Sequence, residues 1–300
     1  MSRKFSPWPF FTEEEIHSVK NVLSSNKVNY WTGDECRKFE KEFAVWADSK
    51  YAVTLANGTL ALDIAFKALG IGAGDEVIVT SRSYIASITS IINSGATPVF
   101  VDVDLESQNI TPNNISSAIN NKTKAILCVH LAGWPCEMNE IKSIANTHNL
   151  FIIEDCAQAH GAKYKGVSVG SIGDIGCWSF CQDKIMTTGG EGGMVTTSDK
   201  SLWLKMWEYK DHGKSYEAVY EREHPQGFKW LHESFGTNWR MTEMQGAIGR
   251  IQLNRMSEWT RLRNRNADIL TKAFLKFANK DGIIRIPQLN CDEGSTHAYY

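Results

Sequence analysis

Short apolar runs alternate with longer stretches of helical spacing from residue 51 onward. The run at 51–55 precedes "GTLALDIAFKALG", the run at 76–80 precedes "YIASITSIINSG", and the run at 98–103 precedes "TPNNISSAI". Two more runs, "KAILCVHL" and "LFIIEDC", flank the helical stretch "EMNEIKSIANTHN". Continuous apolar strands joined by helices are typical of a mainly parallel sheet with helices on both faces. We therefore predict an α/β fold.

The pattern changes after residue 170. "IGCWSFC" and "GGMVTT" predict two more strands, and the loop between them contains Lys184. "SLWLKMWEYKDHG" predicts a helix in which Trp203 and Trp207, four residues apart, face the core. Two separate helices are expected in "RMTEMQGAIGRIQLNRM" and in "SEWTRLRNRNADILTKAF", and the helical pattern weakens after about residue 280.

The composition is that of an ordinary globular protein. The chain has 300 residues, of which 42% are hydrophobic, and a formal net charge of −2. This charge gives no reason to expect nucleic acid or an acidic membrane surface as a partner. No apolar run is long enough to cross a bilayer, and the N-terminal "MSRKFSPWPFFTEEE" lacks the apolar stretch of a signal peptide. We therefore expect a cytoplasmic protein with neither a nucleic-acid nor a membrane partner.

The seven cysteines do not form a pattern of pairs, and an odd number argues against a disulfide framework. Cys177 and Cys181 lie in one strand-like run, but neither a second cysteine pair nor a histidine at ligand spacing accompanies them. We therefore expect no bound metal and interpret most of these thiols as small apolar side chains of the core.

Three features that favour ligand binding lie where predicted strands end, the place where open α/β sheets bind ligands. A turn at 57–59 leads into a helix, where free backbone amides suit an anion. Asp155 lies at the tip of an apolar strand, and Lys184 follows another strand near "GGEGG". Each feature also has a structural explanation: a helix cap, an acid that caps a loop, and a surface lysine beside a hairpin turn.

Polar neighbours surround the acid at the strand tip. Glu154, Asp155, Gln158 and His160 come together in "EDCAQAHG". An ionised acid in such a place is costly to bury unless a cation or hydrogen bonds offset the loss of water. The grouping therefore favours a functional site over a purely structural acid.

Taken together, the three features match the requirements of pyridoxal phosphate. That cofactor needs an anion cradle for its phosphate, an acid at its ring nitrogen, an aromatic neighbour and a lysine for its aldehyde. The turn at 57–59 and Ser179 supply the cradle, Asp155 the acid, Lys184 the amine and Tyr84 the aromatic ring.

The chain resembles the DegT/StrS-type sugar aminotransferases, which are pyridoxal-phosphate enzymes of the aspartate-aminotransferase fold (fold type I). The similarity extends, in order, through "GDECRKFEKEFA", "NGTLALDIAFKALGIGAGDEVIV", "GATPVFVDVD", "IIEDCAQAHGA", "GDIGCWSFCQDKIMTTGGEGGMV", "DHG" and "GTNWRMTEMQGAIGRIQL". These blocks cover nearly the whole chain and are specific in combination. The resemblance implies that fold, with a mainly parallel sheet between helices and a small C-terminal domain.

The resemblance also implies a role for each candidate residue. Lys184 would carry the cofactor as an internal aldimine, and Asp155 would pair with the pyridinium nitrogen. The other implied contacts are those of Gln158 with the ring's phenolic oxygen, of Tyr84 stacked on the ring, and of Gly58, Thr59 and Ser179 with the phosphate. Asn238 matches a family residue that reaches the phosphate of the neighbouring subunit, which implies a homodimer with shared active sites.

The activity that the resemblance implies is amino-group transfer. An amino acid, which we expect to be glutamate, would convert the cofactor to pyridoxamine phosphate. A nucleotide-linked keto-deoxysugar would then take the amino group, in the synthesis of a surface polysaccharide such as the O-antigen of lipopolysaccharide. Three alternatives stay open: a nucleotide-sugar 3-dehydratase, whose relatives have histidine in place of Lys184; a non-catalytic regulatory relative; and a desulfurase with Cys156 or Cys181 as nucleophile.

A division of the chain follows from the same resemblance. We expect a large cofactor-binding domain over 1–255, in which segment 1–50 packs at the mouth of the active site. We expect the start of a small C-terminal domain over 256–300, incomplete because family members continue beyond "HAYY". Arg82 stands where the family has an aromatic or a small residue, so we expect substrate contacts near Tyr84 to differ.

Overall fold

The computed structural model describes residues 7–278, 285–287 and 294–300. A seven-stranded sheet with the order β1-β9-β8-β5-β4-β2-β3 forms its centre. Its strands are β1 (Tyr51–Leu55), β2 (Glu76–Thr80), β3 (Thr97–Val101), β4 (Thr123–Val129), β5 (Phe151–Asp155), β8 (Ile175–Ser179) and β9 (Gly193–Thr197). All neighbours from β8 to β3 pair in parallel, whereas β9 runs antiparallel to β1 and to β8. The predicted mainly parallel sheet is confirmed.

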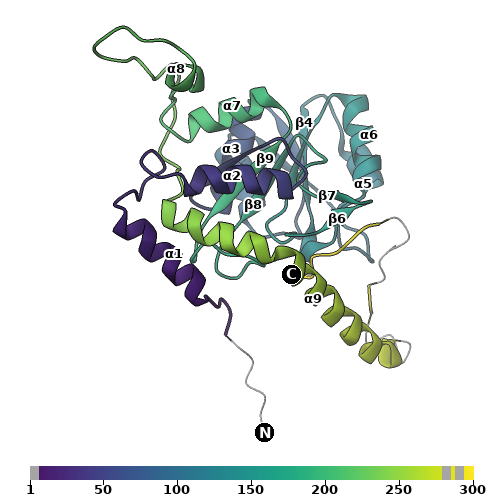
Figure 1. Ribbon diagram of the computed structural model, residues 1–300. Coiled ribbons are helices and arrows are strands. Elements are labelled where there is room, and N and C mark those ends of the chain that lie inside the picture. Colours follow the sequence, from purple (N-terminus) through teal and green to yellow (C-terminus); the bar gives the residue numbers. More distant parts are fainter. Residues whose placement is uncertain (1–6, 279–284, 288–293) are drawn as a thin grey trace.

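Helices cover both faces of this sheet (Figure 1). They are α1 (Glu13–Ser24), α2 (Glu35–Trp46), α3 (Gly58–Leu69), α4 (Ala86–Asn93), α5 (Pro112–Ala118), α6 (Met138–His148), α7 (Lys200–Tyr209), α8 (Tyr216–Tyr220) and α9 (Glu243–Ala278), with a 3-10 turn at Leu131–Gly133. A separate two-stranded sheet pairs β6 (Lys163–Tyr164) with β7 (Val167–Ser168). The cores place α3, α4 and α7 on one face and α2, α5, α6 and α9 on the other.

Alternating side chains of each strand enter different cores. In β5, Ile153 packs in the core under α3 and α4, whereas Ile152 packs in the core under α5 and α6. Because side chains alternate along a strand, Asp155 lies on the face of Ile153, and Glu154 lies on the face of Ile152. The predicted inward placement of the two tryptophans of α7 is confirmed, since Trp207 is buried and Trp203 packs against the same core as Ile153.

Residues 243–278 form a single helix, α9, and not the two helices predicted from the sequence. No proline or glycine separates the two predicted stretches, so no residue there interrupts the backbone hydrogen bonds of a helix. Met256 lies at the join and is buried in the same core as Phe39 of α2. Burial of that apolar side chain adds packing energy to the continuous helix.

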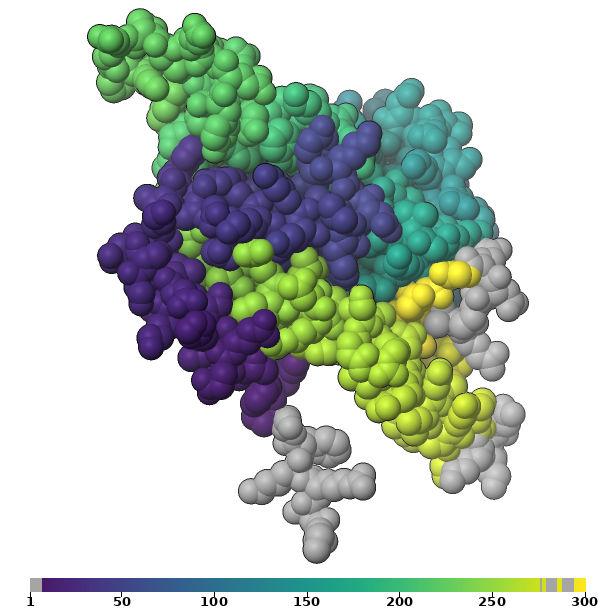
Figure 2. Space-filling view, in the orientation of Figure 1, coloured from purple at the N-terminus to yellow at the C-terminus, as the bar shows by residue number. Residues whose placement is uncertain are grey.

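Ion pairs attach α9 to the N-terminal helices. Arg250 contacts Glu35 and Glu42 of α2, each at 2.7 Å, and Arg255 contacts Glu15 of α1 at 2.7 Å. Figure 1 shows α9 running past α2 and then extending beyond the sheet, and Figure 2 shows the N-terminal helices and α9 side by side on one surface. Among the described residues, no helix combines the length and the apolar character that a membrane span requires.

Candidate active site

A pocket of about 570 Å³ lies beyond the carboxyl ends of β1, β2, β5 and β8. Turns that follow four different strands meet there, which is where ligands bind in open α/β sheets. The predicted site residues that line it are Asn57, Gly58, Thr59, Tyr84, Asp155, Gln158, Ser179 and Lys184. Because β1 and β8 end at the same edge of the sheet, Asn57 and Lys184 line one pocket although they are 127 positions apart in the sequence.

The beginning of α3 forms one wall of the pocket. The Asn57 side chain caps the helix by accepting a hydrogen bond of 3.0 Å from the backbone amide of Leu60. A Cβ at Gly58 would lie 2.5 Å from Cβ of Ser179, so only glycine lets the helix start approach the end of β8 this closely. The backbone amides at a helix start carry partial positive charge. Together with the hydroxyls of Thr59 and Ser179, they form a cradle suited to an anion.

Asp155 lies at the base of the pocket on the α3 side of the sheet. Its Oδ2 accepts 2.8 Å from the Ser87 hydroxyl, and its Oδ1 accepts 3.1 Å from the Ala157 amide. Burial raises the pKa of this carboxyl, and the two hydrogen bonds oppose the shift only in part. The carboxylate is therefore a buried acid that a cation in the pocket would stabilise.

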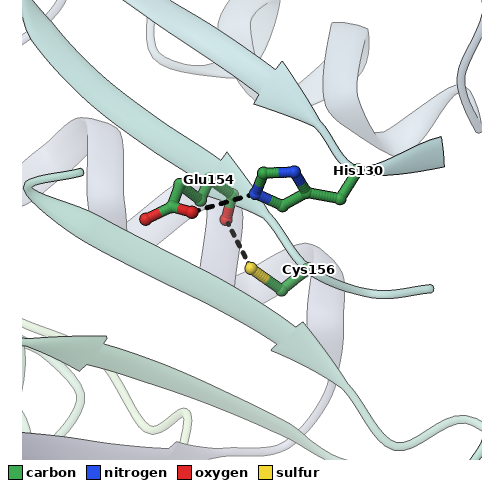
Figure 3. A group of neighbouring side chains, drawn as sticks. All are labelled: His130, Glu154 and Cys156. Carbon is green, nitrogen blue, oxygen red and sulfur yellow. Dashed lines mark hydrogen bonds and ion pairs between the residues drawn. The ribbon is translucent and has the colours of Figure 1, made fainter. Parts of the chain in front are cut away.

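Glu154, which precedes Asp155 in the sequence, belongs to the other face of the sheet. Its carboxylate accepts 2.9 Å from Nε2 of His130, at the end of β4 (Figure 3). It also accepts 2.8 Å from the amide of Gly170, 2.9 Å from that of Ile172 and 2.7 Å from that of Gly173. Burial acts to raise its pKa, but the hydrogen bond from His130 and these amides outweigh burial and lower it.

The ligand atoms of His130, Glu154 and Cys156 lie within 4.8 Å of one another, a grouping that could hold a metal ion. Each of these atoms already has a partner. Nδ1 of His130 accepts 3.1 Å from the Cys136 amide, and the Cys156 thiol faces the Glu154 carbonyl oxygen at 3.7 Å. Burial raises the pKa of the Cys156 thiol well above its usual range, which disfavours the thiolate that a metal requires. We interpret the cluster as a structural network that ties β4, β5 and the 170–173 turn together.

Lys184 lies in the loop between β8 and β9, as predicted, with its amine directed at two polar groups. Nζ lies 3.1 Å from the Tyr300 hydroxyl and 3.3 Å from Oδ2 of Asp183. Burial would lower the pKa of this amine, but Tyr300 and Asp183 outweigh burial and raise it. The indole of Trp8 donates 3.2 Å to the Lys184 carbonyl, so the N-terminal segment contacts the lysine loop.

Two further predicted residues lie at the rim of the pocket. The Gln158 side-chain oxygen accepts 2.7 Å from the amide of Ala132, which leaves its amide nitrogen as the group that can donate to a ligand. Tyr84 lines the pocket with an exposed ring.

Three residues singled out in the sequence lie outside this pocket. Asn238 is exposed, and its backbone pairs with Asp211. Arg82 lines a neighbouring cavity with Trp134. His160, which the sequence groups with Asp155 at the strand tip, is buried beside Trp178 and Phe180, and burial lowers its pKa to about 3. The turn after β5 directs His160 toward the core on the α2 side.

Sequence reasoning missed Ser87, Asp183 and Tyr300. Ser87 lies in the first turn of α4, and Asp183 precedes the lysine. Both residues follow predicted strands, and this position is the signal that could have marked them as site residues. Tyr300 is 116 residues from Lys184, and nothing in its local sequence points to the pocket.

A model of the DegT/DnrJ/EryC1/StrS aminotransferase family matches residues 9–299. The chain belongs to this family. A GDP-perosamine synthase from Escherichia coli O157:H7 is 44% identical over 264 residues, which are 88% of this chain and 69% of that protein. A dTDP-3-amino-3,6-dideoxy-alpha-D-galactopyranose transaminase from Aneurinibacillus thermoaerophilus is 41% identical over 249 residues, 82% of this chain and 64% of that protein.

The crystal structures of family members agree with the fold described above. An aminotransferase from Psychrobacter cryohalolentis is 64% identical and superposes with a TM-score of 0.96 over 99% of this chain and 75% of that structure. The chain therefore has the aspartate-aminotransferase-like fold that the resemblance implied. The chain spans between 58% and 70% of the length of the first curated relatives it matches.

Proposed function

We propose that this protein is a pyridoxal-phosphate-dependent aminotransferase that moves an amino group from an amino acid, glutamate, to a keto-deoxysugar linked to a nucleotide. The observation that carries the proposal is one pocket in which Lys184, the buried Asp155 and the cradle at Gly58 and Ser179 face each other. The names of the two sugar-forming relatives support the class of acceptor.

The residues of the pocket fit the cofactor part by part. Thr59, Ser179 and the amides at the start of α3 would hold the phosphate, and the tight approach of Gly58 to Ser179 shapes that cradle. Gln158 would donate to the ring oxygen, and Tyr84 would cover the ring. Lys184 would hold the cofactor covalently through Nζ. When bound, pyridoxal phosphate supplies an electron sink for the carbon that loses or gains a proton.

Asp155 would hold the ring nitrogen in its protonated form. Two unit charges at about 4 Å attract each other by about 4 kcal/mol at an effective dielectric constant of about 20, before desolvation is subtracted. Ser87 and Ala157 fix the direction of the carboxylate through their hydrogen bonds. Because burial raises the pKa of Asp155, a cation bound beside it would also relieve an unfavourable buried charge.

Lys184 would take the proton from the carbon that loses it, as general base, and would then give it to the carbon that gains it, as general acid. It is the only lysine among the residues that line the pocket in the described part of the chain. This position also separates the proposal from the dehydratase alternative, whose relatives have histidine where this chain has Lys184. The desulfurase alternative would need a reactive thiolate, but Cys156 is buried and burial raises the pKa of both Cys156 and Cys181.

Further parts of the proposal rest on the family resemblance. We propose a homodimer in which Asn238 reaches the phosphate of the neighbouring active site, and its exposed position on one chain suits such a contact. We keep the division into a large domain over 1–255 and a small C-terminal domain over 256–300, and we note that α9 runs across that boundary. We propose a cytoplasmic enzyme of surface-polysaccharide synthesis.

The proposal is tested with a panel of nucleotide-linked 3-keto and 4-keto sugars. Each sugar is incubated with the protein, pyridoxal phosphate and glutamate, and the products are identified by mass spectrometry. We expect an amino sugar from at least one member, and none with Lys184→Ala. Lys122→Ala, which changes an exposed lysine between α5 and β4, is the matched control and should keep full activity. Loss of a hydroxyl without amination would instead support the dehydratase.

A further inference from the structure

Lys184, Asp183 and Tyr300 form a closed triangle of hydrogen bonds in the pocket wall. Nζ of Lys184 lies 3.1 Å from the Tyr300 hydroxyl and 3.3 Å from Oδ2 of Asp183. The Tyr300 hydroxyl donates to the same Oδ2 atom. Nζ also lies 4.6 Å from the centre of the Tyr300 ring, within the range of a cation–π contact. The lysine amine thus has a defined place that is built by two other residues.

We propose that Tyr300 and Asp183 form the site that receives the Lys184 amine whenever this lysine is not joined to the cofactor, and that they fix its position and its basicity. This assignment rests on the proposed function, because that reaction releases the lysine in every cycle. Tyr300 is then a positioning residue for the lysine, and Asp183 orients Tyr300.

The protonation states give each hydrogen bond one direction. Burial, followed by the hydrogen bond to Asp183, raises the pKa of Tyr300, so its hydroxyl stays protonated at neutral pH. Burial acts to raise the pKa of Asp183, but the hydrogen bond from Tyr300 and the charge of Lys184 lower it, so this group is a carboxylate. The Lys184 ammonium therefore donates to both acceptors, and the phenol donates onward to the carboxylate.

The same triangle gives the lysine a path for its proton. One Nζ–H bond of the ammonium breaks as the proton joins the Tyr300 oxygen, while the original Tyr300 O–H proton joins Oδ2 of Asp183. The products are a neutral amine, a neutral phenol and a protonated carboxyl group, so the total charge is unchanged. The Asp183 side chain is 56% exposed, and water can then take the proton from it.

Five other titratable groups surround the triangle. Asp155 of β5 and His160 interact with Lys184, although His160 is neutral near pH 7 because burial lowers its pKa to about 3. The Cys181 thiol hydrogen-bonds the Asp183 side chain, Glu191 lines the same pocket, and Arg263 of α9 interacts with Tyr300. In the part of the chain that the structure describes, Nζ donates hydrogen bonds to Tyr300 and Asp183 alone. Removal of either partner should therefore change the pKa of Lys184 more than a change to any of these five groups.

The test measures Lys184 directly in the cofactor-free protein. Wild type, Tyr300→Phe and Asp183→Asn are treated briefly with trace acetic anhydride over a pH series, and acetylation of Lys184 is quantified by mass spectrometry. The other lysines in the same digest serve as internal references. Tyr164→Phe is the matched control, because the Tyr164 hydroxyl also contacts a carboxylate, Glu137 at 3.3 Å, but away from this pocket.

We expect Lys184 to become reactive at lower pH in Tyr300→Phe and in Asp183→Asn than in the wild type, because both changes remove acceptors that stabilise the ammonium. Tyr164→Phe should titrate like the wild type. An unchanged Lys184 titration in folded Tyr300→Phe protein would overturn the assignment. If Tyr300→Phe does not fold, as judged by circular dichroism, the Asp183→Asn titration decides alone.

A second readout follows in the loaded enzyme once its substrates are known. Because the assignment has Tyr300 act on the released lysine, Tyr300→Phe should lower kcat by roughly 10-fold to 100-fold and leave KM nearly unchanged. A rise in KM with unchanged kcat would contradict the assignment. The two proposals can fail separately: a protein that never binds pyridoxal phosphate would refute the proposed function, whereas the Lys184 titration would still report on Tyr300.

Discussion

Glu154 and Asp155 are adjacent in β5, and their carboxylates lie on opposite faces of the sheet. Asp155 lines the pocket and accepts a hydrogen bond from Ser87 of α4. Glu154 is buried on the opposite face, where it accepts hydrogen bonds from His130 and from the turn at 170–173 (Figure 3). The two acids therefore have separate surroundings: Asp155 faces the pocket, and Glu154 belongs to the hydrogen-bond network that holds the strand tip.

Replacement of Asp155 by asparagine should stabilise the cofactor-free protein at neutral pH and weaken catalysis. The folded-state pKa of Asp155 is raised, so the folded state binds its proton more tightly than the unfolded state does. Its contribution to the free energy of unfolding therefore falls as pH rises through the interval from the unfolded pKa of about 3.9 up to the folded value. Urea unfolding of Asp155→Asn and wild type across that interval measures the difference. Catalysis should fall by roughly 100-fold or more.

The stability of wild type relative to Asp155→Asn should thus decline from acid to neutral pH. A difference that is constant over this range would contradict the burial of an ionised Asp155.

Replacement of Glu154 by alanine should destabilise the fold strongly, although Glu154 does not line the pocket. The change leaves His130 and three backbone amides without their acceptor, and loss of one partner of a buried pair costs about 3–5 kcal/mol. Because its pKa is lowered in the folded state, the contribution of Glu154 is present above its unfolded pKa and is lost as pH falls through the folded value. Urea unfolding at neutral and acid pH measures both effects.

Glu258→Ala is the control for this experiment, since Glu258 is an exposed acid that pairs with Arg261. We expect it to unfold at nearly the wild-type urea concentration. If Glu154→Ala does the same, the network at the end of β5 does not hold the strand.

Replacement of Gly58 by alanine should weaken binding of pyridoxal phosphate by about tenfold or more. The new methyl group would lie 2.5 Å from Cβ and 2.9 Å from Oγ of Ser179, so the start of α3 must move away from β8. Gly72→Ala is the matched control, because its Cβ would meet only the Ser94 carbonyl oxygen at 3.4 Å. Cofactor titration followed by absorbance compares the two. Equal affinities for both variants would show that the cradle at Gly58 and Ser179 does not bind the phosphate.

Metal removal should have no effect on the protein. The atoms of His130 and Glu154 that could bind an ion already have hydrogen-bond partners, and the Cys156 thiol stays protonated. We expect dialysis against EDTA to leave the unfolding midpoint and the cofactor affinity unchanged. A lower midpoint that added zinc restores would show that the cluster is a metal site.

The sequence was sufficient to predict the sheet and the pocket edge. Apolar strands joined by helices imply parallel pairing, and parallel strands end at one edge, so Asn57, Asp155 and Ser179 were expected near each other. The strand ends also explain why Lys184 was found: its loop joins two of the predicted strands. The local chemistry and the topology pointed to the same place.

Other features depend on contacts that local sequence does not encode. Tyr300 reaches Lys184 from a distant segment, and α9 stays continuous because Met256 is buried against other helices. His160 follows Asp155 closely in the sequence, but the turn after β5 directs it into the core. Position near a strand tip therefore identifies the neighbourhood of a site, and tertiary packing decides which side chains enter it.

Borohydride reduction of the purified protein with pyridoxal phosphate tests the central claim most directly, followed by digestion and mass spectrometry. We predict that the peptide containing Lys184 gains the mass of the reduced cofactor, and that Lys184→Ala protein gains none. A wild-type protein that stays colourless with the cofactor, or that gains this mass only at other lysines, would contradict the assignment of Lys184 as the residue that holds it.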